Sequence, residues 1–260
     1  MQNKAALPKR LIHGSLLALT ILVSYLSNSG YYNGQTMASI SAKYENLFTP
    51  QGYAFSIWGL IYIALIGFVI FFKLPENPIA PISKAYKAIS LYFSLSCIFN
   101  MLWVICWLED YTGLSVLIMI LLFLSLLKVS LSIPFYIKAL KIKGLSAAMI
   151  RYPFQLYSGW VSLALLANLS VYITKLNLFT STLAPEYWAI GMLTLACLLH
   201  LYMLWAKNMP LFTLVAPWTL IAIALKNQPI SPLIYSLAIS ASLVLLASIA
   251  TQSIYKMIKR

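Results

Sequence analysis

The stretch FTPQGYAFSIWGLIY, residues 48–62, changes character from a loop to a membrane helix. Its proline and its first glycine interrupt regular structure, and an apolar run without charged residues follows them. Phe55, Trp58 and Tyr62 recur at helical spacing, which places their rings on one face of the expected helix. This aromatic row either lines a cavity between helices or packs against a neighbouring helix, and the stretch alone favours neither interpretation.

The composition of the whole chain is typical of a membrane protein. Of the 260 residues, 62% are hydrophobic and only 9% are charged, whereas about a quarter of the residues in a soluble domain are charged. Eight hydrophobic stretches each approach the roughly 20 residues that a helix needs to cross a bilayer. They cover residues 11–28, 53–73, 86–108, 112–133, 152–174, 187–206, 210–226 and 233–255. The sequence therefore predicts an all-α integral membrane protein with about eight transmembrane helices.

The basic residues gather in alternate connections. All but three of the 18 Lys and Arg residues fall at the termini or in and beside the second, fourth and sixth connections, and Lys128 is counted with them because it lies near the end of the fourth span. The exceptions are Lys43, Lys175 and Lys226. This positive-inside bias predicts a multi-pass protein of the cell (inner) membrane with both termini in the cytoplasm. The net charge of +13 then reflects topology and attraction to the lipid bilayer. No nucleic acid partner is expected, because the sequence has no basic helix face or RNA-binding motif.

Acidic side chains are absent from the predicted spans. Four of the five lie in connections on the predicted outer side, and Glu76 lies on the inner side. This pattern argues against a pump that depends on carboxylates within the membrane. His200 lies within the sixth span and is a possible haem ligand. We expect a packed or water-facing histidine instead, because His13 is the only other histidine in the chain.

The sequence contains no recognisable catalytic or metal-binding motif. The three cysteines form no C-x-x-C pair, and there is no P-loop, H-E-x-x-H motif or Gly-rich dinucleotide turn. We therefore assign no catalytic or metal-binding residue and expect no required cofactor. Enzymatic activity stays open without support from a motif.

The connection at residues 29–51 is the longest on the predicted outer side. Loops of this length within a compact protein are often functional lids. A solvated linker is the alternative, and we favour the lid.

The third span carries a polar and aromatic stripe on one helix face. Its members are Tyr92, Ser96, Asn100, Trp103 and Trp107. Asn100 lies near the middle of the membrane and must face protein, water or a ligand, because an unpaired amide in hydrocarbon is costly. Contact between two helices is the common use of such an asparagine. The two indoles on the same face favour a lined pocket, although an interfacial anchor is the alternative for Trp107.

The fifth span repeats this pattern. One side of it carries Tyr157, Trp160, Ala164, Ala167 and Asn168. Small residues permit close approach of a neighbouring helix. Asn168 is a second amide within the membrane, and the faces that carry Asn100 and Asn168 are candidates to meet.

Three motifs resemble those of the tryptophan-rich sensory protein family, also known as the translocator protein (TspO/MBR, peripheral benzodiazepine receptor-type) family. The sequence WVSLA at 160–164, followed by Asn168, resembles the signature of the fifth helix. The sequence NMLW at 100–103 resembles the N-x-x-W of the third helix, and residues 48–62 resemble the start of the second. The motifs occur in the family's order, and the resemblance covers about residues 10–175.

The chain also departs from the family pattern. Gln51 replaces the second proline of the family pair, Tyr53 stands where the family has tryptophan, and Leu163 replaces an aromatic residue. The family usually has five helices, so this chain looks like a long and divergent member. We expect residues 1–175 to form a TspO-like bundle of five membrane helices and residues 176–260 to form a three-helix membrane extension.

The resemblance implies a pocket that is covered by the first loop and binds a tetrapyrrole such as protoporphyrin IX. Our leading hypothesis is a membrane-embedded binding and sensory protein, or receptor, for a flat and largely apolar ligand, since such a ligand stacks on aromatic rings. A small-solute or tetrapyrrole transporter is the first alternative, favoured by the eight spans and Pro217, and a porphyrin-modifying enzyme is the second. The expected partners are the lipid bilayer and the apolar or tetrapyrrole ligand, and a homodimer is a candidate assembly. The candidate ligand-binding residues are Tyr53, Phe55, Trp58, Tyr62, Asn100, Trp103, Trp107, Trp160 and Asn168.

Overall fold

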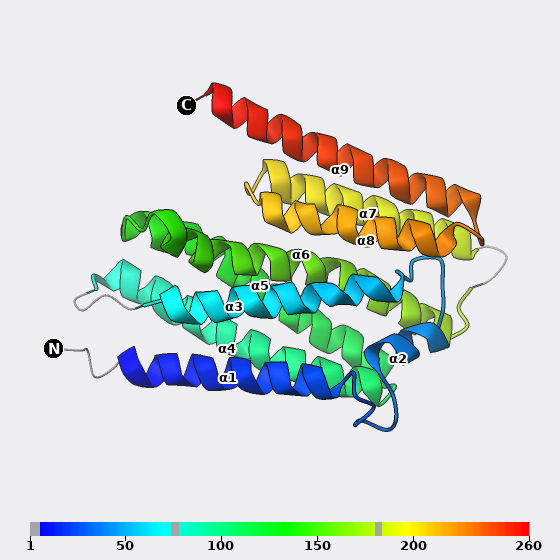
Figure 1. Ribbon diagram of the computed structural model, residues 1–260, viewed down its shortest axis with the longest axis horizontal. Coiled ribbons are helices and arrows are strands. Elements are labelled where there is room, and N and C mark those ends of the chain that lie inside the picture. The colour runs from blue at the N-terminus through cyan, green and yellow to red at the C-terminus, as the bar shows by residue number, and fades with distance from the viewer. Residues whose placement is uncertain (1–5, 74–77, 180–183, 260) are drawn as a thin grey trace. The chain divides into compact units, whose positions relative to one another are not determined.

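The computed structural model describes residues 6–73, 78–179 and 184–259, and within them every regular element is a helix. In chain order the elements are α1 (Ala6–Leu26), α2 (Met37–Lys43), the 3₁₀ helix η1 (Gly52–Ser56), α3 (Ile57–Phe71), α4 (Ala80–Leu108), α5 (Thr112–Ala139), α6 (Gly144–Lys175), α7 (Pro185–Trp205), α8 (Pro210–Asn227) and α9 (Pro232–Ile258) (Figure 1). The predicted all-α class is confirmed. Lys4, Glu76 and Arg260, which contributed to the charge pattern, lie outside the described residues.

Seven of the eight predicted spans correspond to one helix each, and the second corresponds to η1 and α3 together. In the part of the chain that the structure describes, seven helices are long and apolar enough to cross a bilayer. The apolar part of α1, Arg10–Leu26, is shorter. A multi-pass membrane protein with about eight helices therefore fits the structure.

Several helices extend beyond the hydrophobic stretches that predicted them. A proline lies in the first turn of α4, α7, α8 and α9, where its missing N–H costs no hydrogen bond. α5 and α6 continue through Pro134 and Pro153 into more polar sequence. Hydropathy marks only the part of a helix that suits hydrocarbon, so it underestimated these lengths.

The connection between α1 and α3 contains more structure than the sequence indicated. Residues 29–51 were expected to form a loop, but α2 lies within them. Its seven residues, MASISAK, are too few for a clear apolar period. The second predicted span also begins differently, because η1 precedes α3 and the α-helix starts only at Ile57.

The chain packs as two compact units. The first combines Met1–Met37 with Trp58–Ser158, and the second combines Ala38–Ile57 with Gly159–Arg260. α6 is shared, because its first half belongs to the first unit and its second half to the second.

These units describe packing and do not test the limits of a TspO-like bundle. The division into residues 1–175 and 176–260 therefore stays a prediction.

Aromatic side chains form the core of the first unit, in which α4 packs along α1 and α5. Phe68, Phe93 and Phe154 are fully buried. The Phe68 ring centroid lies 4.6 Å from that of Phe154 and 5.0 Å from that of Phe93. His13 joins α1 to this core through a 2.7 Å hydrogen bond between its Nε2 and Ser90 Oγ.

Close helix contacts and buried polar groups form the core of the second unit, in which α8 packs against α7, α9 and η1. Gly159 of α6 lies against the backbone of Phe212 in α8. His200 of α7 is fully buried, and its Nε2 lies 3.1 Å from Ser162 Oγ. Thr213 Oγ1 donates to the His200 carbonyl at 2.9 Å. The expectation of a packed His200 is thus confirmed.

Candidate functional site

Four aromatic candidates in the first unit form a continuous row of rings. Trp58 stacks on Tyr62, with ring centroids 5.5 Å apart and planes 23° apart. It also stacks on Trp103, at 6.0 Å and 28°. Trp107 continues the row, 6.3 Å from Trp103. We call Trp58, Tyr62, Trp103 and Trp107 the tryptophan cluster.

Helical spacing on α3 and α4 produces this row. Trp58 and Tyr62 are four residues apart on α3, so they share a face. The predicted stripe on α4 faces inward, since Asn100 is 0%, Trp103 4% and Trp107 5% exposed. Trp58 and Tyr62 are half-buried, so the row joins a buried end to an accessible end.

Two buried polar atoms next to this row have no hydrogen-bond partner among the described residues. Asn100 Nδ2 donates to Tyr157 Oη at 2.7 Å, but Asn100 Oδ1 accepts no hydrogen bond. Trp103 Nε1 is also buried and donates to no acceptor. Leaving such a group unsatisfied costs about 1–3 kcal/mol. An acceptor and a donor are thus available one turn apart on one helix face.

Hydrogen bonds to neighbouring residues hold both ends of the tryptophan cluster. Tyr62 Oη lies 2.5 Å from Ser24 Oγ of α1. Trp107 Nε1 donates to the Met37 carbonyl at 3.3 Å. Because Trp107 is buried and hydrogen-bonded to protein, it packs within the unit instead of acting as an exposed interfacial anchor.

The other candidate residues lie in the second unit. Phe55 of η1 contacts Trp160 of α6 edge-on, with centroids 5.9 Å apart. Tyr53 is 38% exposed and contacts Trp218 of α8 in the same way at 5.2 Å. Asn168 is buried.

The α-helix that was predicted to carry Phe55, Trp58 and Tyr62 begins only at Ile57, so Phe55 lies outside it. Residues 52–56 form a 3₁₀ helix with three residues per turn, so the α-helical period does not extend to Phe55. Asn100 lies in the first unit and Asn168 in the second. Their meeting stays a prediction, as does ligand binding by each candidate residue.

Two residues outside the candidate ligand-binding set contact these rings in the structure. Tyr157 accepts the Asn100 hydrogen bond, and its ring lies 5.5 Å from that of Trp58. Its position three residues before Trp160 was a usable signal. Trp218 follows a proline inside α8, and no pattern linked it to Tyr53.

We expect Tyr157→Phe to destabilise the protein by about 1–3 kcal/mol, because Asn100 Nδ2 would lose its buried acceptor. Thermal unfolding of the purified protein in nanodiscs measures this loss. Tyr152→Phe is the control, since Tyr152 lies on the same helix and is 40% exposed. Equal melting temperatures for the two variants would contradict the assigned role of this hydrogen bond.

Comparison with known proteins identifies the family. A family model described as TSPO-like protein matches residues 10–251, and the match extends beyond residue 175 into α7, α8 and α9. No curated protein and no solved structure shows a significant match to the chain. Because the family match spans most of its length, this chain belongs to the TSPO-like protein family.

Proposed function

We propose that this protein binds and senses a flat, largely apolar ligand of the tetrapyrrole type, such as protoporphyrin IX, at the tryptophan cluster. The observation that carries the proposal is the row of rings from Tyr62 to Trp107, together with two unsatisfied polar atoms on α4, Asn100 Oδ1 and Trp103 Nε1. Family membership supports the same class of protein.

The chemistry of the row suits a ligand with a broad π surface. Aromatic rings prefer offset or edge-on contacts, and the rings of Trp58 and Tyr62 are only half-buried, which leaves part of each side chain accessible. The buried acceptor and donor on α4 suit a ligand edge that carries one donor and one acceptor, for example a carboxylic acid. Ligand sites in proteins commonly combine an apolar lining with a few polar groups of this kind.

A titration of the protein in nanodiscs with protoporphyrin IX tests the proposal, with the porphyrin Soret absorbance as the readout. We expect saturable binding by the wild type. Trp103→Phe keeps a stacked ring but removes the indole N–H, so we expect roughly three- to tenfold weaker binding from the loss of one hydrogen bond. Trp205→Phe is the matched control, since Trp205 is 49% exposed and lies in the second unit.

Two results would contradict the proposal. Absorbance changes that do not saturate and are equal in all variants would show partitioning of the porphyrin into lipid. Equal losses in Trp103→Phe and Trp205→Phe would show that the tryptophan cluster has no special role. Either result would direct attention to solute uptake by proteoliposomes.

The same preparations separate binding from the alternative activities. Net movement of porphyrin or solute across proteoliposomes would identify a transporter. Conversion of bound porphyrin to a new product would identify an enzyme. Saturable binding without either result is the expectation for a binding and sensory protein.

A further inference from the structure

The segment that precedes α3 is held along its length by one helix of the C-terminal part. We call residues 45–54 the entry segment, because it leads through η1 into α3. All of its contacts with α8 described here lie within the second unit. Lys226 Nζ forms an ion pair with Glu45 Oε1 at 2.5 Å, and Asn227 Nδ2 donates to the Leu47 carbonyl at 2.9 Å. Gln51 N donates to the Ala222 carbonyl at 3.1 Å. Trp218 Nε1 donates to the Ala54 carbonyl at 3.2 Å, and the Trp218 ring contacts that of Tyr53.

These contacts have the regularity of a docking face. Trp218, Ala222 and Lys226 are four residues apart on α8, so they lie on one side of the helix. Along that side the partners run backward through the entry segment, from residue 54 to residue 45. A whole helix face, and not a single fortuitous contact, therefore holds the segment.

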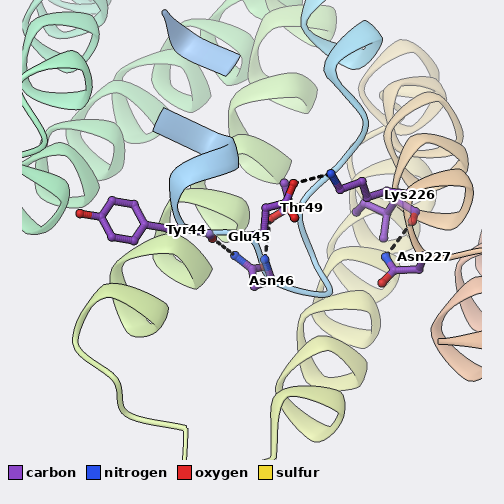
Figure 2. Close-up of polar contacts among 7 residues, drawn as sticks. Tyr44, Glu45, Asn46, Thr49, Lys226 and Asn227 are labelled. Atoms are coloured by element: carbon purple, nitrogen blue, oxygen red, sulfur yellow. Dashed lines mark hydrogen bonds and ion pairs between the residues drawn. The ribbon is translucent and has the colours of Figure 1, made fainter. Parts of the chain in front are cut away.

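The entry segment also has its own folded turn, which presents it to α8 (Figure 2). Asn46 Oδ1 accepts from Phe48 N at 3.0 Å, and Thr49 Oγ1 accepts from Asn46 N at 3.1 Å. Phe48, Thr49 and Pro50 are buried. Side chains of this kind stabilise turns through short hydrogen bonds to the backbone, so the segment docks as a formed unit.

The ion pair differs in its exposure from the hydrogen bond of Asn227, the neighbouring residue on α8. The Lys226 side chain is 30% exposed and the Glu45 side chain is 50% exposed, whereas Asn227 is only 1% exposed. Water and salt can therefore reach the charged pair and weaken it, while the buried amide stays protected.

We propose that α8 is a latch for the entry segment and that the ion pair of Glu45 with Lys226 is its releasable contact. Trp58 is the second residue of α3, which η1 joins without a break. Release of the latch thus removes a restraint on the chain where it enters the tryptophan cluster, and ligand exchange becomes faster. We call this control of ligand exchange the gating role of the latch. The gating role rests on the proposed function, whereas the latch itself does not.

Thiol labelling of a buried position measures the latch without any ligand. Ala54 is fully buried, and Ala54→Cys is a small change. It is made in a protein whose native cysteines, Cys97, Cys106 and Cys197, are replaced by alanine. The rate of modification by a charged, water-soluble maleimide in nanodiscs then reports opening of the segment, because only the open state exposes the thiol.

Charge reversal tests the releasable contact. We expect Lys226→Glu and Glu45→Lys each to label about tenfold faster, because each opens the segment more often. The double variant that combines both changes restores the pair with its charges exchanged and should label at nearly the original rate. Lys207→Glu, which makes the same charge change elsewhere in the second unit, should have no effect. Lys226→Gln removes the charge alone and serves if a reversal prevents folding.

The outcomes are decisive for the latch. Unchanged labelling in the single variants, or fast labelling that the double variant does not reverse, overturns it.

Stopped-flow mixing with protoporphyrin IX tests the gating role. Lys226→Glu should show faster association and faster dissociation of the porphyrin with an unchanged dissociation constant. If the thiol at position 54 is labelled faster but the association and dissociation rates of the porphyrin do not change, the gating role is overturned and the latch is still supported. Absence of porphyrin binding by the wild type refutes the proposed function and the gating with it, and labelling still decides whether the latch exists.

Discussion

Trp58→Ala should bind protoporphyrin IX about tenfold to a hundredfold more weakly than the wild type. Trp58 is central in the tryptophan cluster, because its ring stacks on both Tyr62 and Trp103. Removing the indole takes away roughly 100 Å² of apolar contact with a flat ligand, which corresponds to about 1.5–3 kcal/mol of binding free energy. Because Trp58 is only half-buried, its loss should affect binding more than folding.

The comparison needs two further variants, measured by Soret absorbance in nanodiscs together with thermal unfolding. Trp58→Phe keeps a smaller stacking surface and should fall between alanine and the wild type. Trp205→Ala removes an exposed indole from α7 and should leave affinity unchanged. If Trp58→Ala binds as tightly as Trp205→Ala does, the tryptophan cluster is not the ligand site.

The helices were predictable because each span is a local property of the sequence. A run of about 20 apolar residues is sufficient to indicate a membrane helix, whatever its neighbours are. The inward face of α4 was predictable for a related reason. Asn100 cannot face hydrocarbon without a partner, so its position fixed which side of the helix is buried, and Trp103 and Trp107 followed by helical period.

The arrangement of residues around α3 was not predictable in this way. Phe55 and Trp58 are three residues apart, yet one lies in η1 with Trp160 as its neighbour and the other lies in α3 beside Trp103. The change from 3₁₀ to α-helix between them depends on tertiary packing, which overrides local periodicity.

The contacts of α8 illustrate the same limit. Lys226 and Glu45 are far apart in the sequence, and neither belongs to a motif. The last quoted family motif ends at Asn168, whereas the family match continues to residue 251. The short motifs therefore captured the aromatic part of the pattern and gave no information on the helices that follow it.

Gly159→Ala should lower the stability of the second unit by about 1–3 kcal/mol or more, because it overpacks a contact between two helices. A Cβ atom at this position would lie 2.5 Å from the Phe212 carbonyl oxygen and 3.0 Å from its Cα. Both are backbone atoms, so no side-chain rotation can relieve the overlap, and α6 and α8 must move apart. Small residues at helix contacts in membranes permit this close approach.

A series of glycine variants separates this clash from the general effect of adding a methyl group to a helix. At Gly191 a new Cβ would meet no heavy atom within 4 Å, so alanine there should be neutral or slightly stabilising. At Gly67 it would lie 2.8 Å from Met149 Sδ, which a flexible side chain can relieve, so a smaller loss is expected. Melting temperatures in nanodiscs should therefore fall in the order Gly191→Ala, Gly67→Ala, Gly159→Ala.

If Gly159→Ala has the same melting temperature as Gly191→Ala, the backbone contact between α6 and α8 is looser than the structure shows. Gly159→Ala can also be combined with Ala54→Cys. Faster thiol labelling in that protein would show that the close approach of α6 to α8 also supports the face of α8 that holds the entry segment.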